Sequence, residues 1–488
     1  MIVRVFLPAF ALFSLLVGSL SVVAQESVPG EYRHWTTSDG TRSTVRLKLV
    51  DERDGHVQLQ REDNSKLVVM PLTRLSVADR RYLSERNAAS PTPTATSDWP
   101  QWRGPNRDGK SPATGLPTQW DAEGPRLIWT ISGLGEGYST PAVVGDTVYV
   151  LGTRANEEYI FARNFDDGNG IWESRVGTKS GGGGFPGPKG TPAVEDGRIY
   201  AIGSDGTLVC VNQRDGSPVW KKSFKRDFGG EHGHWEYAES PLIDGDKVIC
   251  TPGGNSGCVV ALRKDNGAPI WSSPVGRVMG GDFARAGYAS TIVATIAGTK
   301  QYIAFLHGGV VGVDAARGTP LWHYDAPANG TANCSTPVVE GDSVFAASAY
   351  GTGGGKARVA KRGSSWNVSE EFFVKKMESH HGGFVLHEGY IYGTNNSVLM
   401  CLDWDTGAVK WQDRCVGKGS ITYADGHLYV RGERGEVALV EATPSGYREK
   451  GRFTQPYRSD KNAWAHPVIA GNRLYLHDHD RLLCYELK

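Results

Sequence analysis

The chain of 488 residues repeats one short pattern, Gly-x-x-x-Trp, at the ends of successive units of similar length. Most units open with Ser or Thr followed by Pro and a short apolar run, and then pass through a turn containing Gly and Asp into a second apolar strand. Five units end in the full pattern, at Gly168/Trp172, Gly216/Trp220, Gly267/Trp271, Gly318/Trp322 and Gly407/Trp411. A repeat of this length predicts a row of small sheets that pack on one another.

Two further units carry the opening but lack the closing tryptophan. One reaches Phe372 where the tryptophan should fall, with Trp366 out of register, and another offers Phe453. The last unit lacks a fourth strand, while residues 126–129, which end in Trp129, precede the first unit and belong to none. We expect this orphan strand to complete the last unit, because an open ring would leave two unpaired sheet edges.

The tryptophans of the pattern are expected to fill the interfaces between neighbouring sheets. A propeller has no single core, so each interface needs its own apolar filling, and a large flat indole supplies it. The predicted fold is all-β: an eight-bladed β-propeller with tryptophan-docking repeats over residues 98–488, preceded by a small SH3-like barrel. The predicted docking residues are Trp129, Trp172, Trp220, Trp271, Trp322 and Trp411.

Three shorter segments precede the repeats. Residues 1–24 predict a Sec signal peptide, with an apolar run followed by small residues at the cleavage site. The alternative is an uncleaved membrane anchor, because the run is nearly long enough to span a bilayer. Residues 31–86 alternate in hydrophobicity around an Asp-Gly turn at 54–55, which predicts the SH3-like barrel. Residues 87–97, rich in Pro, Thr and Ala, predict a linker.

Residues 31–86 resemble the SLA1 homology 1 (SHD1) domain. The matching residues are Arg33 and Trp35, Ser38-Asp39-Gly40, Pro71-Leu72, and Leu75-Ser76 followed by Asp79. That family is a protein-binding adaptor module, so the resemblance implies a protein or peptide partner for residues 31–86.

From Trp99 onward the chain resembles the pyrroloquinoline-quinone (PQQ)-type propeller repeat family, which includes quinoprotein alcohol dehydrogenases and the outer-membrane assembly lipoprotein BamB. The resemblance rests on repeat ends such as LDWDTGAVKW at residues 402–411. The chain is still more similar to secreted propellers of the planctomycete type. They share the lead-in WPQWRGPNRDG at residues 99–109, the pair Tyr237 and Glu239, and His380-His381 before two glycines.

The dehydrogenase branch of this resemblance implies PQQ, a calcium ion, a catalytic Asp and often an adjacent cysteine pair. The chain has seven cysteines with no adjacent pair, no haem motif, and no Asp that could be assigned as the base. We therefore expect no cofactor and no catalytic residue, and PQQ with Ca²⁺ belongs to the alternative of an oxidoreductase. The cysteines are expected to be mostly buried free thiols, with a Cys250–Cys258 disulfide as the alternative.

The segments just before the first strand of each unit are expected to converge on one mouth of the central channel. Their aromatic, histidine, lysine and carboxylate side chains suit a small polar ligand or a peptide. The candidate ligand-binding residues are His232, His234, Trp235, Tyr237, Glu239, Asp282, Arg285, His380, His381, Lys418, Trp464 and His466. For the histidines a structural role in the channel wall is favoured, ligand contact is the alternative, and no metal site is predicted.

These patterns favour a secreted or periplasmic, non-catalytic binding or scaffold protein. The alternatives are a PQQ-dependent oxidoreductase and a carbohydrate- or peptide-binding propeller. Lys+Arg and Asp+Glu both number 53, so the net charge is zero and nucleic acid is not expected as a partner. No membrane span is expected after signal cleavage.

Overall fold

The computed structural model describes residues 32–53, 56–76, 78–80 and 98–488. The predicted signal peptide (1–24) and linker (87–97) lie outside these residues. The chain divides into two compact units, residues 1–95 and 96–488.

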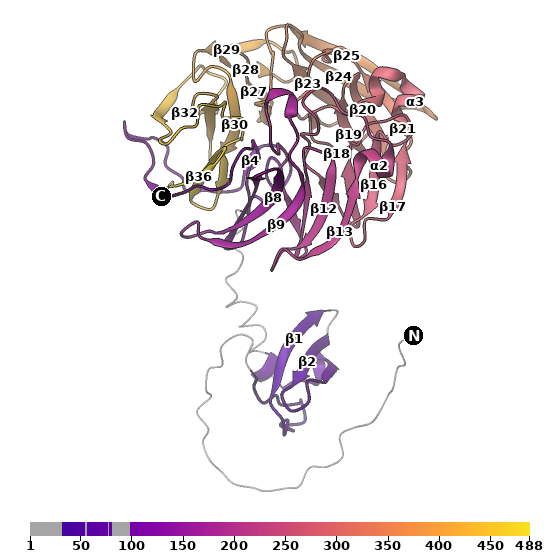
Figure 1. Cartoon of the computed structure of the whole chain (residues 1–488), viewed down its shortest axis with the longest axis vertical. Coiled ribbons are helices and arrows are strands. Elements are labelled where there is room, and N and C mark those ends of the chain that lie inside the picture. The colour runs from indigo at the N-terminus through magenta and orange to yellow at the C-terminus, as the bar shows by residue number, and fades with distance from the viewer. Residues whose placement is uncertain (1–31, 54–55, 77, 81–97) are drawn as a thin grey trace. The chain divides into compact units, whose positions relative to one another are not determined.

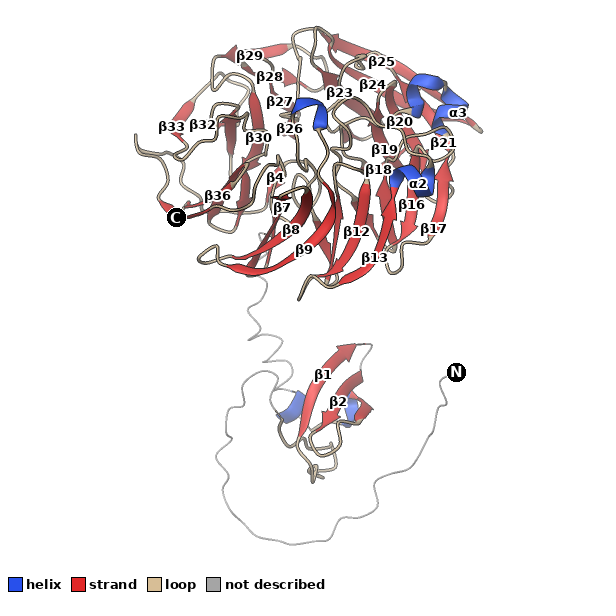
Figure 2. Cartoon of the chain, in the orientation of Figure 1, coloured by secondary structure: helices blue, strands red, loops and turns tan. Residues whose placement is uncertain are grey.

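The first unit contains an antiparallel sheet of three strands in the order β1-β2-β3 (Figures 1 and 2). Its elements are β1 (Leu47–Arg53), β2 (His56–Arg61), β3 (Leu67–Pro71) and the 3₁₀ helix η1 (Leu72–Arg74). The core comprises Trp35, Leu47, Val57, Leu59 and Leu75. The buried Asp79 accepts a hydrogen bond from the Thr36 N–H (2.6 Å), and its own N–H donates to Ser76 Oγ (3.0 Å).

The second unit is built from eight antiparallel sheets that lie side by side around a common centre (Figure 1). The first sheet contains β6 (Ala142–Val144), β7 (Thr147–Arg154), β8 (Glu157–Asn164) and β9 (Gly170–Thr178), and the second contains β10 (Ala193–Glu195), β11 (Arg198–Ile202), β12 (Thr207–Asn212) and β13 (Pro218–Ser223). The third contains β14 (Leu242–Asp244), β15 (Lys247–Cys250), β16 (Val259–Arg263) and β17 (Pro269–Ser273). The fourth contains β18 (Ile292–Ile296), β19 (Thr299–Leu306), β20 (Gly309–Asp314) and β21 (Pro320–Tyr324).

The remaining four sheets follow the same order along the chain. The fifth contains β22 (Val338–Glu340), β23 (Ser343–Ser348), β24 (Gly353–Arg362) and β25 (Ser365–Val374), and the sixth contains β26 (Phe384–His387), β27 (Tyr390–Thr394), β28 (Leu399–Asp403) and β29 (Val409–Asp413). The seventh contains β30 (Gly419–Ala424), β31 (His427–Gly432), β32 (Glu436–Glu441) and β33 (Glu449–Thr454), with β4 (Lys110–Ser111) beside β30. The eighth contains β34 (Val468–Ala470), β35 (Arg473–Asp478) and β36 (Arg481–Glu486), with β5 (Leu127–Ile131) as its fourth strand. The short β4 lies parallel to β30, a pairing that the sequence repeat does not predict.

Strand β5 completes the last sheet, as expected from the sequence. It pairs antiparallel with β36, and Trp129 faces Cys484 in the register. The last sheet therefore combines strands from both ends of the unit, and its side chains pack against those of the first sheet.

The expected docking tryptophans lie between neighbouring sheets. The indole N–H of Trp172 donates to the Gln213 carbonyl of the next sheet (3.1 Å), and that of Trp220 donates to the Lys264 carbonyl (3.0 Å). The ring of Trp172 lies on Gly216, which has a φ of +70°, and a Cβ there would come within 2.5 Å of the indole. The glycine of the pattern is thus needed both for its turn and for the close approach of the neighbouring ring.

Several interfaces depart from this arrangement; the indole N–H of Trp271, for example, has no hydrogen-bond partner among the described residues. The indole of Trp322 donates within its own sheet, to Gln301 Oε1 (2.7 Å), while its ring packs among residues of the next sheet such as Val344. In one of the two sheets that lack the tryptophan, the ring of Phe372 lies on Gly407, as the indole of Trp172 lies on Gly216. The smaller ring fills the interface without the indole hydrogen bond.

The helices of this unit are short: α2 (Phe224–Phe228), α3 (Val275–Met279), η2 (Gly182–Gly184) and η3 (Gly281–Ala284) (Figure 2). Within the ranges that the structure describes, no helix combines the length and the apolar character that crossing a membrane requires. All seven cysteines are free thiols, so the alternative of a Cys250–Cys258 disulfide is wrong.

Candidate functional site

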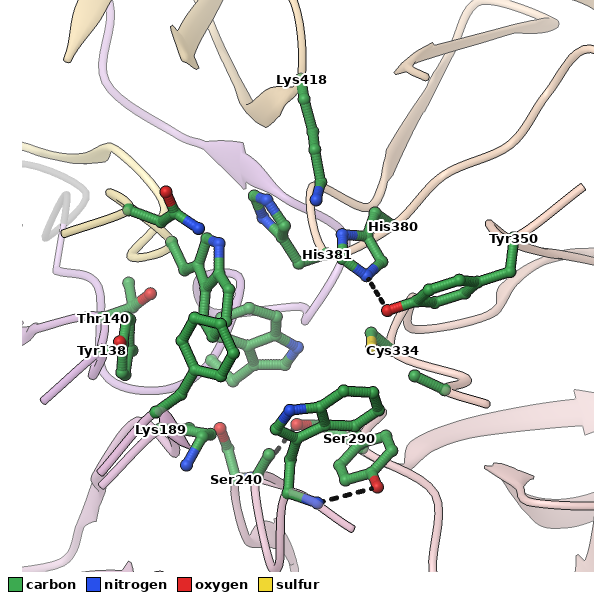
Figure 3. A pocket seen from close by; sticks show the side chains of 18 residues that line it. Tyr138, Thr140, Lys189, Ser240, Ser290, Cys334, Tyr350, His380, His381 and Lys418 are labelled. Atoms are coloured by element: carbon green, nitrogen blue, oxygen red, sulfur yellow. Dashed lines mark hydrogen bonds between the residues drawn. The ribbon is translucent and has the colours of Figure 1, made fainter. Parts of the chain in front are cut away.

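A cavity of about 220 Å³, the axial pocket, opens where the eight sheets meet (Figure 3). Every sheet contributes to its wall from the segment just before its first strand. These residues are Tyr138 and Thr140, Lys189, Ala238 and Ser240, Tyr288 and Ser290, Ala332 and Cys334, His380 and His381, Lys418, and Asn462 and Trp464. Trp102, Phe185, Trp235 and Tyr350 complete the lining.

Residues 99–111, the lead-in segment, run across the space that the first strands surround. The segment bonds to first strands of several sheets: Trp99 N–H to the Val143 carbonyl (2.8 Å), the Val194 N–H to the Pro100 carbonyl (2.8 Å), the Tyr423 N–H to the Gly109 carbonyl (2.8 Å), and Ser111 Oγ to the Ile469 carbonyl (2.9 Å). Its Trp102 lines the axial pocket and donates to Thr336 Oγ1 (2.9 Å). The lead-in segment therefore forms one end of the pocket.

Two buried arginines fix the lead-in segment in place. Arg107 donates to the carbonyls of Pro241 (2.9 Å) and Ser240 (3.1 Å), and Arg103 donates to the carbonyl of Phe384. Burial lowers the pKa of Arg103 to about 10 and that of Arg107 to about 9. Both side chains stay cationic at neutral pH, but neither lines the pocket, and their hydrogen bonds go to backbone carbonyls around it.

Aromatic rings form most of the pocket wall. Seven aromatic side chains line it: Trp102, Tyr138, Phe185, Trp235, Tyr288, Tyr350 and Trp464. The ring of Trp464 packs against those of Tyr138 (4.5 Å between centroids) and Phe185 (4.7 Å). Packed rings are held in fixed orientations and offer flat apolar faces to a ligand.

One side of the wall holds a polar cluster. His381 Nε2 lies 3.1 Å from Glu433 Oε1, which also accepts from Trp464 Nε1 (2.6 Å) and lies 3.3 Å from Lys418 Nζ. His380 Nε2 bonds the Tyr350 hydroxyl (2.9 Å; Figure 3). Glu433 follows β31 and lies behind its three partners, because it does not itself line the pocket.

Burial and charge fix the ionisation of this cluster. Burial opposes a charge on Glu433, but hydrogen bonds from His381 and Trp464 and the charge of Lys418 outweigh it, and the pKa of Glu433 falls to about 2. Burial lowers the pKa of His380 to about 3, with a further contribution from His381 and Lys418. Burial also lowers the pKa of His381, although Glu433 opposes the shift. At neutral pH the cluster is a carboxylate, a lysine and two neutral imidazoles.

The pocket wall carries two amines and no carboxylate. Lys418 and Lys189 reach it from different sides (Figure 3). Burial lowers the pKa of Lys189 to about 8, although Glu158 and Glu236 oppose the shift, so it is mostly cationic at neutral pH. Burial also raises the pKa of the Cys334 thiol to about 12, which keeps it protonated.

The structure brings five of the twelve sequence-predicted site residues to the pocket wall: Trp235, His380, His381, Lys418 and Trp464. The other seven do not line it. Tyr237 and Glu239 are buried within the third sheet, His466 is buried against Trp102 (4.6 Å between centroids), and Asp282 and Arg285 are exposed. His232 bonds the Gly233 carbonyl (2.7 Å), and His234 packs on Trp235 (5.1 Å).

Sequence reasoning missed several residues of the wall. Tyr138, Lys189 and Tyr288 occupy positions before first strands, so a strict alignment of the units could have found them. Trp102 stands in the lead-in motif, but nothing in the motif says that it crosses the axis. Phe185 comes from a loop that the repeat does not describe, and no sequence signal marks it.

The donor set does not fit the PQQ–calcium pair of a quinoprotein dehydrogenase. Calcium takes about six to eight oxygen ligands, with carboxylates prominent among them. The pocket wall offers no carboxylate, and the nearby Glu433 is a single carboxylate among imidazole and ammonium nitrogens. A flat quinone would match the aromatic walls, but the calcium ion lacks its ligands.

A closed ring of small antiparallel sheets, with interleaved indoles and a pocket on the axis, defines a β-propeller-like fold. The family model described as "Outer membrane protein assembly factor BamB" matches residues 156–413, more than half of the chain, and the chain belongs to that family. BamB of Burkholderia pseudomallei (strain K96243) is 28% identical over 265 residues, covering 47% of this chain and 67% of that protein. BamB of Shewanella oneidensis is 24% identical over 220 residues, and the chain spans only 48% of its length.

Solved structures agree on the fold. BamB from Moraxella catarrhalis superposes with a TM-score of 0.52 at 16% identity, over 74% of this chain and 97% of that one. A quinohemoprotein alcohol dehydrogenase from Pseudomonas putida HK5 superposes with a TM-score of 0.58 at 12% identity, over 80% of each chain. At these identities the similarity establishes a common fold alone.

Proposed function

We propose that the protein is a secreted or periplasmic, non-catalytic binding protein that takes a small, flat, negatively charged ligand in the axial pocket. The observation that carries this proposal is the composition of the wall: seven aromatic rings, two lysines and no carboxylate. Rings stack on a flat ligand, and ammonium groups pair with an anion more strongly where water is partly excluded. A cationic ligand would find no opposite charge on the wall.

The pocket favours binding over turnover. A hydrolytic or transfer site needs a nucleophile beside a base. The thiol of Cys334 is protonated at neutral pH, because burial raises its pKa more than the nearby cation of Lys418 lowers it. The neutral His381 faces a carboxylate and not a nucleophile. We expect no chemical change in a bound ligand.

The proposal is tested by titrating the full chain with aromatic carboxylates, with their neutral amides, and with a hexuronate, following quenching of tryptophan fluorescence. The carboxylate should bind and the amide should bind at least about tenfold more weakly, because the amide keeps the shape and loses the charge. Replacing both lysines, as K189M/K418M, should remove that preference. The exposed Lys221→Met serves as the control. Equal affinity for carboxylate and amide would refute the charge argument, and a preference for the hexuronate would favour the carbohydrate-binding alternative.

The alternative of a PQQ-dependent oxidoreductase is tested in the same preparation. PQQ is added with and without calcium, and dye-linked oxidation of alcohols and aldehydes is followed. We expect no turnover and no effect of calcium, because the wall lacks calcium ligands. Calcium-dependent turnover would establish the oxidoreductase in place of the binding protein.

A second proposed activity belongs to the first unit, which we infer to be an SH3-like barrel of the SHD1 type that binds a protein or peptide. Strand β3 lies at the edge of its sheet, and the side chains of Leu67 (51% exposed) and Val69 (62%) project from it. An exposed apolar edge strand can pair with an extended peptide. Val69→Lys should abolish capture of a partner from the secreted fraction, while Glu62→Lys, nearby and exposed, should not.

We infer further that each of the eight sheets of the second unit is one propeller blade. Four strands follow the same order in every sheet, with β4 added to one of them, and first strands of several neighbouring sheets contact one another. An experimental structure of residues 98–488 tests the blade count directly.

A further inference from the structure

Two consecutive histidines and a glutamate converge on one side of the axial pocket. The candidate ligand atoms of His380, His381 and Glu433 all lie within 4.8 Å of one another. Figure 3 shows the imidazoles of His380 and His381 side by side at the pocket wall. Their sequence neighbours give no hint of this trio, since Glu433 lies 52 residues beyond His381.

Within the part of the chain that the structure describes, each imidazole has one ring nitrogen that is not engaged by another group of the protein. His380 uses Nε2 to bond Tyr350, and His381 uses Nε2 to bond Glu433. The Nδ1 atoms of both rings are buried and have no hydrogen-bond partner among the described residues. A buried ring nitrogen without a partner is unfavourable, so the protein contacts leave neither imidazole saturated and both rings can still take a metal ion.

Hydrogen bonds from residues outside the cluster also hold it in place. The Glu433 carboxylate accepts from Trp464 Nε1 (2.6 Å), and the carbonyl of His381 contacts His466 Nε2 (3.0 Å). Metal ligands that are fixed by such outer contacts need little rearrangement on binding.

We propose that His380, His381 and Glu433 form a site for a divalent transition metal, with Zn²⁺ as its representative. Two imidazoles and one carboxylate are the donor set that zinc and its neighbours prefer, whereas calcium and magnesium prefer oxygen ligands alone. Three protein ligands leave a coordination position open, and His380 and His381 line the pocket where it would face. The site is additional to the organic ligand proposed above and does not depend on it.

Lys418 provides a further test of the proposed metal site. Its Nζ lies 3.3 Å from Glu433 Oε1, so it holds a positive charge beside the cluster. A metal ion must displace this ammonium group or bind against its repulsion. Removing the charge should therefore tighten metal binding, whereas removing the Lys189 charge elsewhere on the wall should change it little.

The test is a titration of the full, metal-stripped chain with Zn²⁺ and Co²⁺, in competition with a chromogenic chelator, with Ca²⁺ as the comparison. We expect one equivalent of Zn²⁺ to bind, Ca²⁺ not to compete, and bound Co²⁺ to give the visible spectrum of nitrogen and oxygen ligation. H380A and E433Q should each weaken binding at least about tenfold. K418M should strengthen it, which a variant that merely misfolds would not do.

Two matched controls exclude other ligands. Cys334 lies on the same wall, so C334S should keep the affinity, and His234 lies outside the cluster, so H234A should keep it too. Absence of binding in both the parent and K418M would overturn the proposal. So would a stoichiometric site that persists in H380A/E433Q. Binding of the aromatic carboxylate is measured separately in the presence of chelator, so the failure of either proposal leaves the other standing.

Discussion

At the scale of single residues, the indole between two sheets does two things at once. The ring of Trp220 packs on Gly267 of the next sheet, and its N–H donates to the Lys264 carbonyl (3.0 Å). We predict that Trp220→Ala costs about 3–5 kcal/mol of unfolding free energy, the range for truncating a buried large aromatic. Urea unfolding followed by circular dichroism measures it. Trp366, off register in β25 and partly exposed, is the control, and an equal cost for Trp366→Ala would contradict a special role of the docking position.

The buried Glu239 predicts a dependence of stability on pH. Burial raises its pKa from 4.5 to about 7; one carboxyl oxygen accepts from the Thr251 N–H (2.6 Å) and the other has no partner. A raised pKa means that the folded state prefers the neutral acid. Its contribution is therefore full below the unfolded pKa and is lost as the pH rises through about 7, at most about 3 kcal/mol.

Glu239→Gln keeps the acceptor and removes the titration. Urea unfolding at pH 5 and pH 8 measures the change in unfolding free energy between the two pH values. Buried histidines with lowered pKa values, such as His466 and His477, stabilise the fold as the pH rises, so the parent's change is the sum of opposing effects. On going from pH 5 to pH 8, Glu239→Gln should gain more stability, or lose less, than the parent. Glu158, whose pKa burial also raises to about 7, titrates in the same window, so Glu158→Gln is measured beside it. An unchanged difference between the two pH values in Glu239→Gln would exclude the assigned cause.

The docking tryptophans could be predicted because each recurs at a fixed distance from a glycine. Glu433 could not, because it follows the second strand of its unit, outside the openings that carry the other candidates. His466 was predicted at the pocket and is instead buried beneath Trp102. A shift of one residue along such a segment decides whether a side chain faces the cavity or the sheet behind it. The spacing of the repeats does not determine that position.

At the scale of elements, the strand β5 is the clearest case of a local pattern with a distant partner. It supplies the fourth strand of the last sheet and pairs with β36, more than three hundred residues away in the chain. The sequence could predict this pairing because the last unit lacked a fourth strand and the strand at residues 126–129 belonged to no unit. The parallel pairing of β4 with β30 involves two residues and left no pattern to follow.

Deleting residues 98–138 should destabilise the second unit strongly, because it removes β4, β5 and the buried arginines of the lead-in segment together. The expected result is a large fall in melting temperature or a failure to fold, measured by calorimetry on the purified chain. Shortening the exposed turn between β24 and β25 at residues 361–366 is the matched control and should leave the melting temperature nearly unchanged. A deletion that melts like the parent would show that β5 does not hold the last sheet.

At the scale of the whole molecule, closure distributes stability evenly around the ring. In an open row of repeats the terminal units have one neighbour each and unfold first, whereas in a closed ring every sheet has two. Trp129 lies at the junction of the two chain ends, and its indole donates to the Phe165 carbonyl of the first sheet (3.1 Å). That contact has the same form as the contacts of Trp172 and Trp220 at the next two interfaces along the ring.

We therefore predict that Trp129→Ala and Trp220→Ala lower the unfolding free energy by similar amounts, about 3–5 kcal/mol each, and that both variants still unfold in one transition with the parent's denaturant dependence. The measurement is urea unfolding followed at two wavelengths, by circular dichroism and by fluorescence. An open row would give a different result: Trp129→Ala would cost little, and a separate early transition would appear as the end sheets detached. The comparison between the two tryptophans thus tests the closure itself, because residue type and indole hydrogen bond are matched, while Trp220 is somewhat more exposed than Trp129.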